Sequence, residues 1–160
     1  MPMTLRTVHP SALPALALLA ACCWSAPAWS QTCADTSEKE IAGLFDRWNT
    51  ALQTGDPHQL VALYAPHSIL LPTVSNQPRI EEAAKLAYFE HFMALGPSGH
   101  VDTQWVDIVC NSAINAGTYT FRFADGTSAR ARFTFTYRHV DGRWLISSHH
   151  SSRMPEPSGP

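Results

Sequence analysis

The sequence lacks the short motifs that hold cofactors, metals and catalytic nucleophiles. It contains no GxGxxG stretch, no flavin signature, no CxxC pair and no His/Cys cluster at metal-ligand spacing. No Ser/His/Asp order or Cys/His pair stands in a recognisable context either. We therefore expect no cofactor, no metal site and no dinucleotide-dependent or thiol redox activity, and the catalytic residues, if there are any, stay unknown.

Charge is also scarce, because only 15% of the residues are charged and the formal net charge is −2. The Lys and Arg residues are scattered along the chain and form no basic run. Nucleic acid binding needs a concentrated positive face, so it is not predicted. Most of these charges are explained by an ordinary solvated surface.

Cysteine is rare, and two of the four cysteines, Cys22 and Cys23, fall within the first thirty residues. The remaining pair, Cys33 and Cys110, would most simply form one disulfide in an exported domain, tying the N-terminal arm to a strand. The alternative is two free thiols, with Cys110 buried as a small apolar residue.

The first thirty residues are typical of a secretory signal peptide. An apolar run follows Arg6, and small residues around Ala28-Trp29-Ser30 indicate cleavage near Ser30. The run is too short to span a bilayer comfortably, so no stable membrane insertion is expected. Leu19-Ala20-Ala21-Cys22 offers a lesser alternative, a lipoprotein anchored at Cys22. Either reading predicts a periplasmic or secreted protein.

Helical patterns fill the first half of the remaining chain. Ser37 to Glu40 form a capping box, and apolar residues at helical spacing predict a helix over 38–54. A short helix is expected to begin at Pro57, with Leu60, Leu63 and Tyr64 as its buried stripe. A short strand over 68–71 and a third helix over 80–95 follow.

From His100 onward the pattern alternates with a period of two residues. It predicts strands over about 100–110, 113–123, 128–140 and 143–151, with hairpin turns at Asp125-Gly126 and Asp141-Gly142. Helices followed by an antiparallel sheet define an α+β fold. We expect an arm over 31–37, one domain over 38–154 and a flexible tail over 155–160.

Three stretches carry a family resemblance through their order and spacing: the first helix running into Thr54-Gly55-Asp56, the segment Tyr88-Phe89-Glu90-His91-Phe92, and DGRWLI at 141–146 followed by His150 and Ser152. Together they resemble the association domain of calcium/calmodulin-dependent protein kinase II. They also resemble its bacterial relatives of the SgcJ/EcaC type, within the nuclear transport factor 2-like or SnoaL-like superfamily. The resemblance covers about residues 38–154, and we expect no kinase domain within this sequence.

The resemblance implies a cone in which a curved antiparallel sheet wraps around the long N-terminal helix. It also implies a pocket at the open end of the cone and homodimers or larger homo-oligomers formed through the sheet. We therefore expect an exported, self-associating binding or assembly module that holds an unidentified small molecule.

The last strand ends in two adjacent histidines, which must point to opposite faces and so cannot easily share a metal. If Leu145 faces the core, then His149 and Ser151 share its face while His150 lies on the other. Contact with a ligand at the pocket mouth would explain this polar strand end. The alternative is that both histidines are hydrogen-bonded structural or interface residues.

A rough alignment with the association domain places Tyr119, Phe135, His149 and Ser151 on the pocket face of the last strands, and Tyr88 is a further pocket candidate. Arginines that the kinase domain carries near three of these places are absent, which weakens the expectation of a carboxylate-binding pocket. Arg132 should face outward by strand alternation, toward a dimer interface. A β-bulge would reverse that alternation, so Arg132 stays a pocket candidate.

An alternative function is a cofactor-independent isomerase, dehydratase or cyclase of the SnoaL or ketosteroid-isomerase type. Such an enzyme needs a carboxylate inside the cone opposite a hydroxyl donor. Asp102 or Asp107 could supply the carboxylate, with Tyr88 or Tyr119 opposite, although a solvated surface position is an ordinary role for either aspartate. A pocket lined only by Tyr, His, Ser and Phe would favour the binding module.

Overall fold

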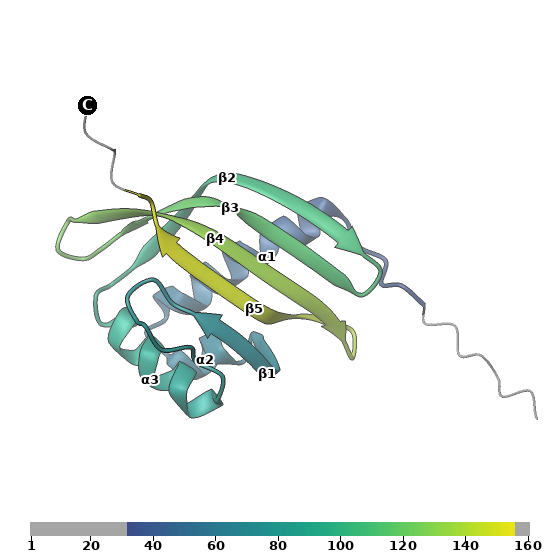
Figure 1. The fold of residues 1–160 in the computed structure, drawn as a ribbon, viewed down its shortest axis with the longest axis horizontal. Helices are drawn as coiled ribbons and strands as arrows, with labels where there is room; N and C mark the ends of the chain where they lie inside the picture. Colours follow the sequence, from purple (N-terminus) through teal and green to yellow (C-terminus); the bar gives the residue numbers. More distant parts are fainter. Residues whose placement is uncertain (1–31, 156–160) are drawn as a thin grey trace, which may run out of the picture. The chain divides into compact units, whose positions relative to one another are not determined.

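The structure is a computed structural model that describes residues 32–155. The signal peptide predicted over 1–30 lies outside the described residues, as does the predicted tail apart from Pro155. The elements, in chain order, are α1 Glu38–Gln53, α2 Pro57–Val61, β1 Tyr64–Leu71, α3 Glu82–Met93, β2 Ser98–Val109, β3 Ser112–Arg122, β4 Ser128–Val140 and β5 Arg143–Arg153 (Figure 1).

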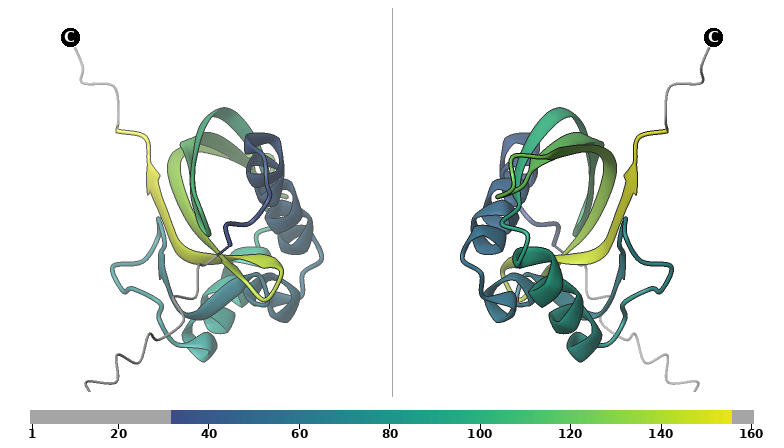
Figure 2. Two further views of the ribbon diagram at one scale, coloured as in Figure 1. Left: turned by 90° about the vertical axis from the view of Figure 1, so that its right-hand side faces the viewer. Right: turned by 90° about the vertical axis from the view of Figure 1, so that its left-hand side faces the viewer.

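The five strands form one bent sheet in the order β1-β5-β4-β3-β2. Strands β2 to β5 pair antiparallel as successive hairpins, and α1 lies across the concave side, as the end-on views in Figure 2 show. The predicted α+β class and curved sheet are thus confirmed. Strand β1 adds a parallel edge to β5, which the hairpin signals did not predict.

Helix α1 forms where the capping box predicts it. Ser37 caps the helix, and its Oγ accepts a hydrogen bond of 3.2 Å from the backbone N–H of Glu40. The face turned toward the sheet is fully apolar and consists of Ile41, Leu44, Phe45, Trp48 and Leu52. Burying this stripe stabilises the helix far more than helix propensity does. No helix within residues 32–155 has the length and apolarity to cross a membrane.

The second helix is shorter than predicted and ends at Val61. Tyr64, expected in its buried stripe, is instead the first residue of β1, which begins four residues earlier than predicted. The register with β5 shifts between Tyr64 and Ile69, and His67 has a positive φ of 58°. This irregularity breaks the period-two pattern, so the start of the strand could not be read from the sequence.

A β-bulge at Ser147 sets which side chains of β5 face inward. Thr136 pairs with Ser148 and Tyr137 pairs with Ile146, so Ser147 is an extra residue whose Oγ bonds the carbonyl of Thr136 at 3.1 Å. The extra residue reverses the alternation of the strand. The expected sharing of one face by Leu145 and His149 is therefore wrong, because the buried residues before the bulge are Trp144 and Ile146.

The predicted disulfide joins Cys33 to Cys110, at the turn between β2 and β3. Two hydrogen bonds from Asn111 support the same attachment: its Oδ1 accepts from the N–H of Ala34 at 2.8 Å, and its Nδ2 donates to the carbonyl of Thr32 at 3.3 Å. The N-terminal arm is thus fixed against the β2–β3 hairpin.

We expect the double variant Cys33→Ser/Cys110→Ser to lose roughly 4 kcal/mol of unfolding free energy, because the bond restrains the unfolded chain. The two cysteines are 77 positions apart. Urea unfolding followed by circular dichroism measures the loss. Wild-type protein treated with dithiothreitol should match the variant, and equal stability of variant and oxidised wild type would contradict the prediction.

Candidate ligand pocket

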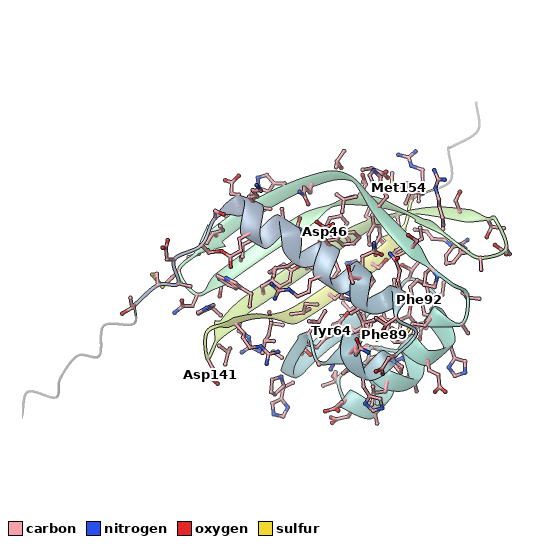
Figure 3. All side chains as sticks on the ribbon, turned by 180° about the vertical axis from the view of Figure 1, so that it is seen from behind. Asp46, Tyr64, Phe89, Phe92, Asp141 and Met154 are labelled. Carbon is pink, nitrogen blue, oxygen red and sulfur yellow. A yellow bond between two sulfur atoms is a disulfide. The ribbon has the colours of Figure 1, made fainter. Side chains whose placement is uncertain are left out.

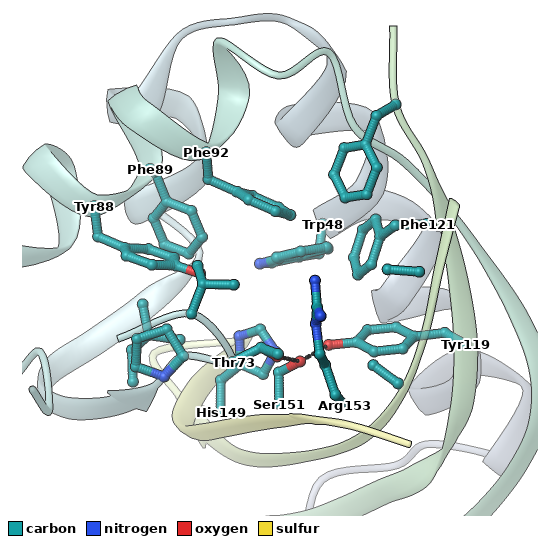
Figure 4. A pocket seen from close by; sticks show the side chains of 16 residues that line it. Trp48, Thr73, Tyr88, Phe89, Phe92, Tyr119, Phe121, His149, Ser151 and Arg153 are labelled. Atoms are coloured by element: carbon teal, nitrogen blue, oxygen red, sulfur yellow. Dashed lines mark hydrogen bonds between the residues drawn. The ribbon is translucent and has the colours of Figure 1, made fainter. Parts of the chain in front are cut away.

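A pocket opens between the concave face of the sheet, α1, α3 and the loop after β1 (Figure 4). Its empty space, counted out to the solvent at the mouth, is about 570 Å³. It is lined by Trp48, Leu70, Pro72, Thr73, Val74, Tyr88, Phe89, Phe92, Tyr119, Phe121, Phe123, Ala129, Ala131, His149, Ser151 and Arg153. This position is the open end of the cone that the family resemblance implies.

The walls are largely aromatic and aliphatic. Trp48 meets Phe89 and Phe121 edge to face, with ring centroids 6.3 Å apart in each pair. Figure 3 shows two of the wall residues, Phe89 and Phe92, at the end of the domain that carries α3. Apolar walls of this kind favour a ligand with an apolar body, because desolvating both surfaces is favourable.

A buried chain of polar groups runs behind the floor of the pocket. Trp48 Nε1–H donates to Tyr64 Oη at 3.2 Å, and Tyr64 Oη lies 2.8 Å from His149 Nδ1. The imidazole also stacks on Phe135, with ring centroids 4.0 Å apart. Burial, and to a lesser extent the neighbouring His150, lower the pKa of His149 to about 3. His149 is therefore a neutral imidazole at physiological pH.

A second chain of hydrogen-bonded side chains connects β3, β5 and the loop after β1 in the wall of the pocket. Tyr119 donates its hydroxyl proton to Ser151 Oγ at 2.5 Å, and Ser151 Oγ lies 2.5 Å from Thr73 Oγ1 (Figure 4). Burial raises the pKa of Tyr119 far above its usual value and that of Tyr88 to about 12. Both phenols keep their protons at physiological pH, so they serve as hydrogen-bond donors or apolar walls and not as bases.

The mouth carries the only charged side chain among the lining residues, the exposed Arg153 (Figure 4). No Asp or Glu belongs to the lining. Asp102 and Asp107 are both exposed, and Asp102 accepts a hydrogen bond of 2.8 Å from Thr120. Among residues 32–155, no three His, Cys, Asp or Glu side chains gather where a metal ion would fit.

The structure brings four of the predicted pocket residues together: Tyr88, Tyr119, His149 and Ser151. Phe135 lies beneath His149, is fully buried and does not reach the cavity. Arg132 is exposed on the outer face, where Nη2 donates to the carbonyl of Arg153 at 3.3 Å. Its pocket placement required a bulge beside it in β4, but the bulge lies in β5, so the outward alternative is the correct one.

Sequence reasoning missed Tyr64, Thr73 and Arg153. The apolar spacing of Leu60, Leu63 and Tyr64 predicts a helix at Tyr64, and Thr73 follows a strand whose parallel pairing has no local signal in the sequence. Arg153 could have been found, because it continues the alternation of His149 and Ser151 by one step. The predicted strand ended at 151, two residues before the end of β5.

The fold belongs to a class shared by many solved proteins, the NTF2-like class. An NTF2-like protein from Pseudomonas putida matches with a TM-score of 0.68 at 20% identity over 79% of this chain and 92% of that one. A cystatin-like-fold member of the class from Novosphingobium aromaticivorans matches with a TM-score of 0.63 at 18% identity, over 75% and 83%. At sequence identities this low, the similarity shows only that the fold is shared.

Sequence similarity then narrows the assignment. The profile of the calcium/calmodulin dependent protein kinase II association domain matches residues 37–155. A proposed association domain of this kind from Xanthomonas campestris is 43% identical, with a TM-score of 0.73, over 80% of this chain and 97% of that one. The chain therefore belongs to the calcium/calmodulin dependent protein kinase II association domain family. No functionally curated protein matches the sequence.

Because the imidazole of His149 is buried in its neutral form, we expect the folded domain to lose stability in acid. His149 in the unfolded chain binds a proton below about pH 6.5, whereas in the folded domain its pKa is about 3. The contribution of His149 to the unfolding free energy is therefore fully present above pH 6.5. It is lost as the pH falls toward 3, by up to about 1.4 kcal/mol per pH unit.

Urea unfolding between pH 7 and pH 4 measures this slope. His149→Gln should flatten it, whereas His150→Gln should keep it, because His150 is exposed on the opposite face. An unchanged slope in His149→Gln would contradict the assignment.

Proposed function

We propose that the domain is a non-catalytic binding and assembly module that holds a small molecule with an apolar body inside the cone. The observation that carries the proposal is the lining of the pocket, which combines apolar walls with a few hydroxyl, imidazole and guanidinium groups and includes no carboxylate. Such a lining can orient and desolvate a ligand but offers no strong base to remove a proton from it.

The isomerase or dehydratase alternative finds little support in this geometry. The aspartates that it required are on the surface, and His149 is neutral with Nδ1 already hydrogen-bonded to Tyr64. A general base must reach the proton it abstracts and have a pKa near the working pH. No residue that lines the pocket meets both conditions.

Self-association through the outer face of the sheet is the second part of the proposal. Trp105 and Val109 on β2 are 60% and 66% exposed, while Val106 and Ile108 between them pack toward the core. Exposed apolar side chains on one sheet face offer contacts that a second copy of the domain would cover.

Export is the third part of the proposal. The Cys33–Cys110 bond supports it, because disulfides persist mainly in oxidising compartments such as the periplasm or the exterior of the cell. A periplasmic or secreted location also agrees with the leader pattern of residues 1–30.

The pocket can be tested with an apolar probe, α-methylstyrene, and a variant that fills the cavity. We expect the probe to raise the melting temperature of the wild type in proportion to its occupancy. Ala129→Phe should abolish that shift, because Ala129 lines the pocket and is not fully buried. Ala94→Phe, an exposed position after α3, serves as the control that keeps it. The same shift in all three proteins would refute specific binding.

Light scattering tests the assembly. The parent protein should be a dimer or larger oligomer at high micromolar concentration, and Trp105→Lys should shift it toward monomer by placing a charge in the interface. Leu95→Lys is the matched control, because Leu95 is 53% exposed but lies beyond α3, away from the outer sheet face. A monomeric parent protein would rule out self-association.

A further inference from the structure

We propose that the floor of the pocket binds an uncharged carbonyl-type oxygen of the ligand, which accepts a hydrogen bond from Nε2–H of His149. The inference rests on the proposed binding function and adds the chemistry by which the ligand is recognised. It follows from the hydrogen-bond partners of three buried residues, Trp48, Tyr64 and His149.

The partners decide which imidazole nitrogen carries the proton. Indole Nε1–H can only donate, so Tyr64 Oη accepts from Trp48. The Tyr64 hydroxyl proton is then satisfied only by donation to His149 Nδ1, which lies 2.8 Å away. Were Nδ1 the donor instead, the phenolic proton would be buried without an acceptor, at a cost of about 1–3 kcal/mol. A neutral imidazole that accepts at Nδ1 carries its proton on Nε2.

This Nε2–H is buried and has no partner among the described residues. The two ring nitrogens point to opposite sides of an imidazole, so Nε2 points away from Tyr64. Side-chain polar atoms in the same situation belong to Ser68, Arg79, Asn115 and Tyr137, none of which lines this pocket. His149 is among the residues that line it, so a ligand oxygen that settled against Nε2–H at the pocket floor would supply the acceptor that this donor lacks.

The surroundings favour an uncharged acceptor over a carboxylate. The His149 ring packs against Phe135 and Trp48, with ring centroids 4.0 and 5.4 Å away, and an ion buried there would lose its hydration. Arg153, the only cation in the lining, is four residues further along β5. The side chain of Arg153 is exposed whereas that of His149 is buried, so a carboxylate at the imidazole would lie away from solvent.

Nitrogen NMR of protein labelled with ¹⁵N-histidine tests the proton assignment directly. In the free protein at pH 7, Nε2 of His149 should resonate as a protonated nitrogen and Nδ1 as an unprotonated one. Tyr64→Phe, which removes the hydroxyl donor, should shift the pattern toward the other tautomer. An unprotonated Nε2 in the wild type would overturn the inference whatever the protein binds.

A matched probe pair tests the recognition. Acetophenone and α-methylstyrene have nearly the same shape, but only acetophenone offers an oxygen acceptor. We expect acetophenone to bind the wild type at least about tenfold more tightly, because it satisfies a buried donor. His149→Leu should lose that preference while retaining α-methylstyrene, and His149→Gln, which keeps an N–H donor near the Nε2 position, should restore part of it. Circular dichroism confirms that each variant folds.

The outcomes separate this inference from the function on which it rests. Equal binding of the two probes by the wild type would overturn the carbonyl site and leave the apolar pocket intact. Binding of neither probe would overturn both. Benzoate provides the remaining comparison: if it binds more tightly than acetophenone, the ligand group at His149 is charged and the proposal of an uncharged oxygen is wrong.

Discussion

The contact between Trp48 and the concave face of the sheet supports both the fold and the pocket. Its indole is 1% exposed and packs against Phe89, Phe121, Phe135 and His149, which come from α3 and three strands. One face of the cavity is therefore also the centre of the core. Because core packing is dense and only slightly compressible, the polar groups held behind this ring keep fixed positions. Their hydrogen bonds accordingly have one consistent arrangement.

The bulge at Ser147 is the second constraint. Trp144 and Ile146 face inward before it, and without an extra residue the next inward side chains would be Ser148, His150 and Ser152. The bulge instead turns His149, Ser151 and Arg153 toward the cone. The extra residue thus turns toward the pocket every polar side chain that β5 contributes to it. Bulges near functional sites commonly reorient side chains in this way.

The two faces of the sheet are suited to separate tasks. The concave face carries the apolar cavity, and the convex face presents exposed Trp105 and Val109 together with threonines and arginines. Because the strand period is two, each face can change without altering the other. NTF2-like proteins share this fold. A fold alone does not specify a function, so the proposed function depends on the side chains of this pocket.

The sequence by itself determined the helices and the four antiparallel strands, because these follow from local periodicity, capping and turn residues. The family followed from the resemblance of three stretches to the association domain. The family resemblance also allowed the sequence to predict four residues of the pocket: Tyr88, Tyr119, His149 and Ser151. Only the tertiary structure decided the parallel placement of β1, the bulge at Ser147 and the hydrogen bonds that join Trp48, Tyr64 and His149. These features join residues up to 85 positions apart, and contacts over such separations leave no local pattern in the chain.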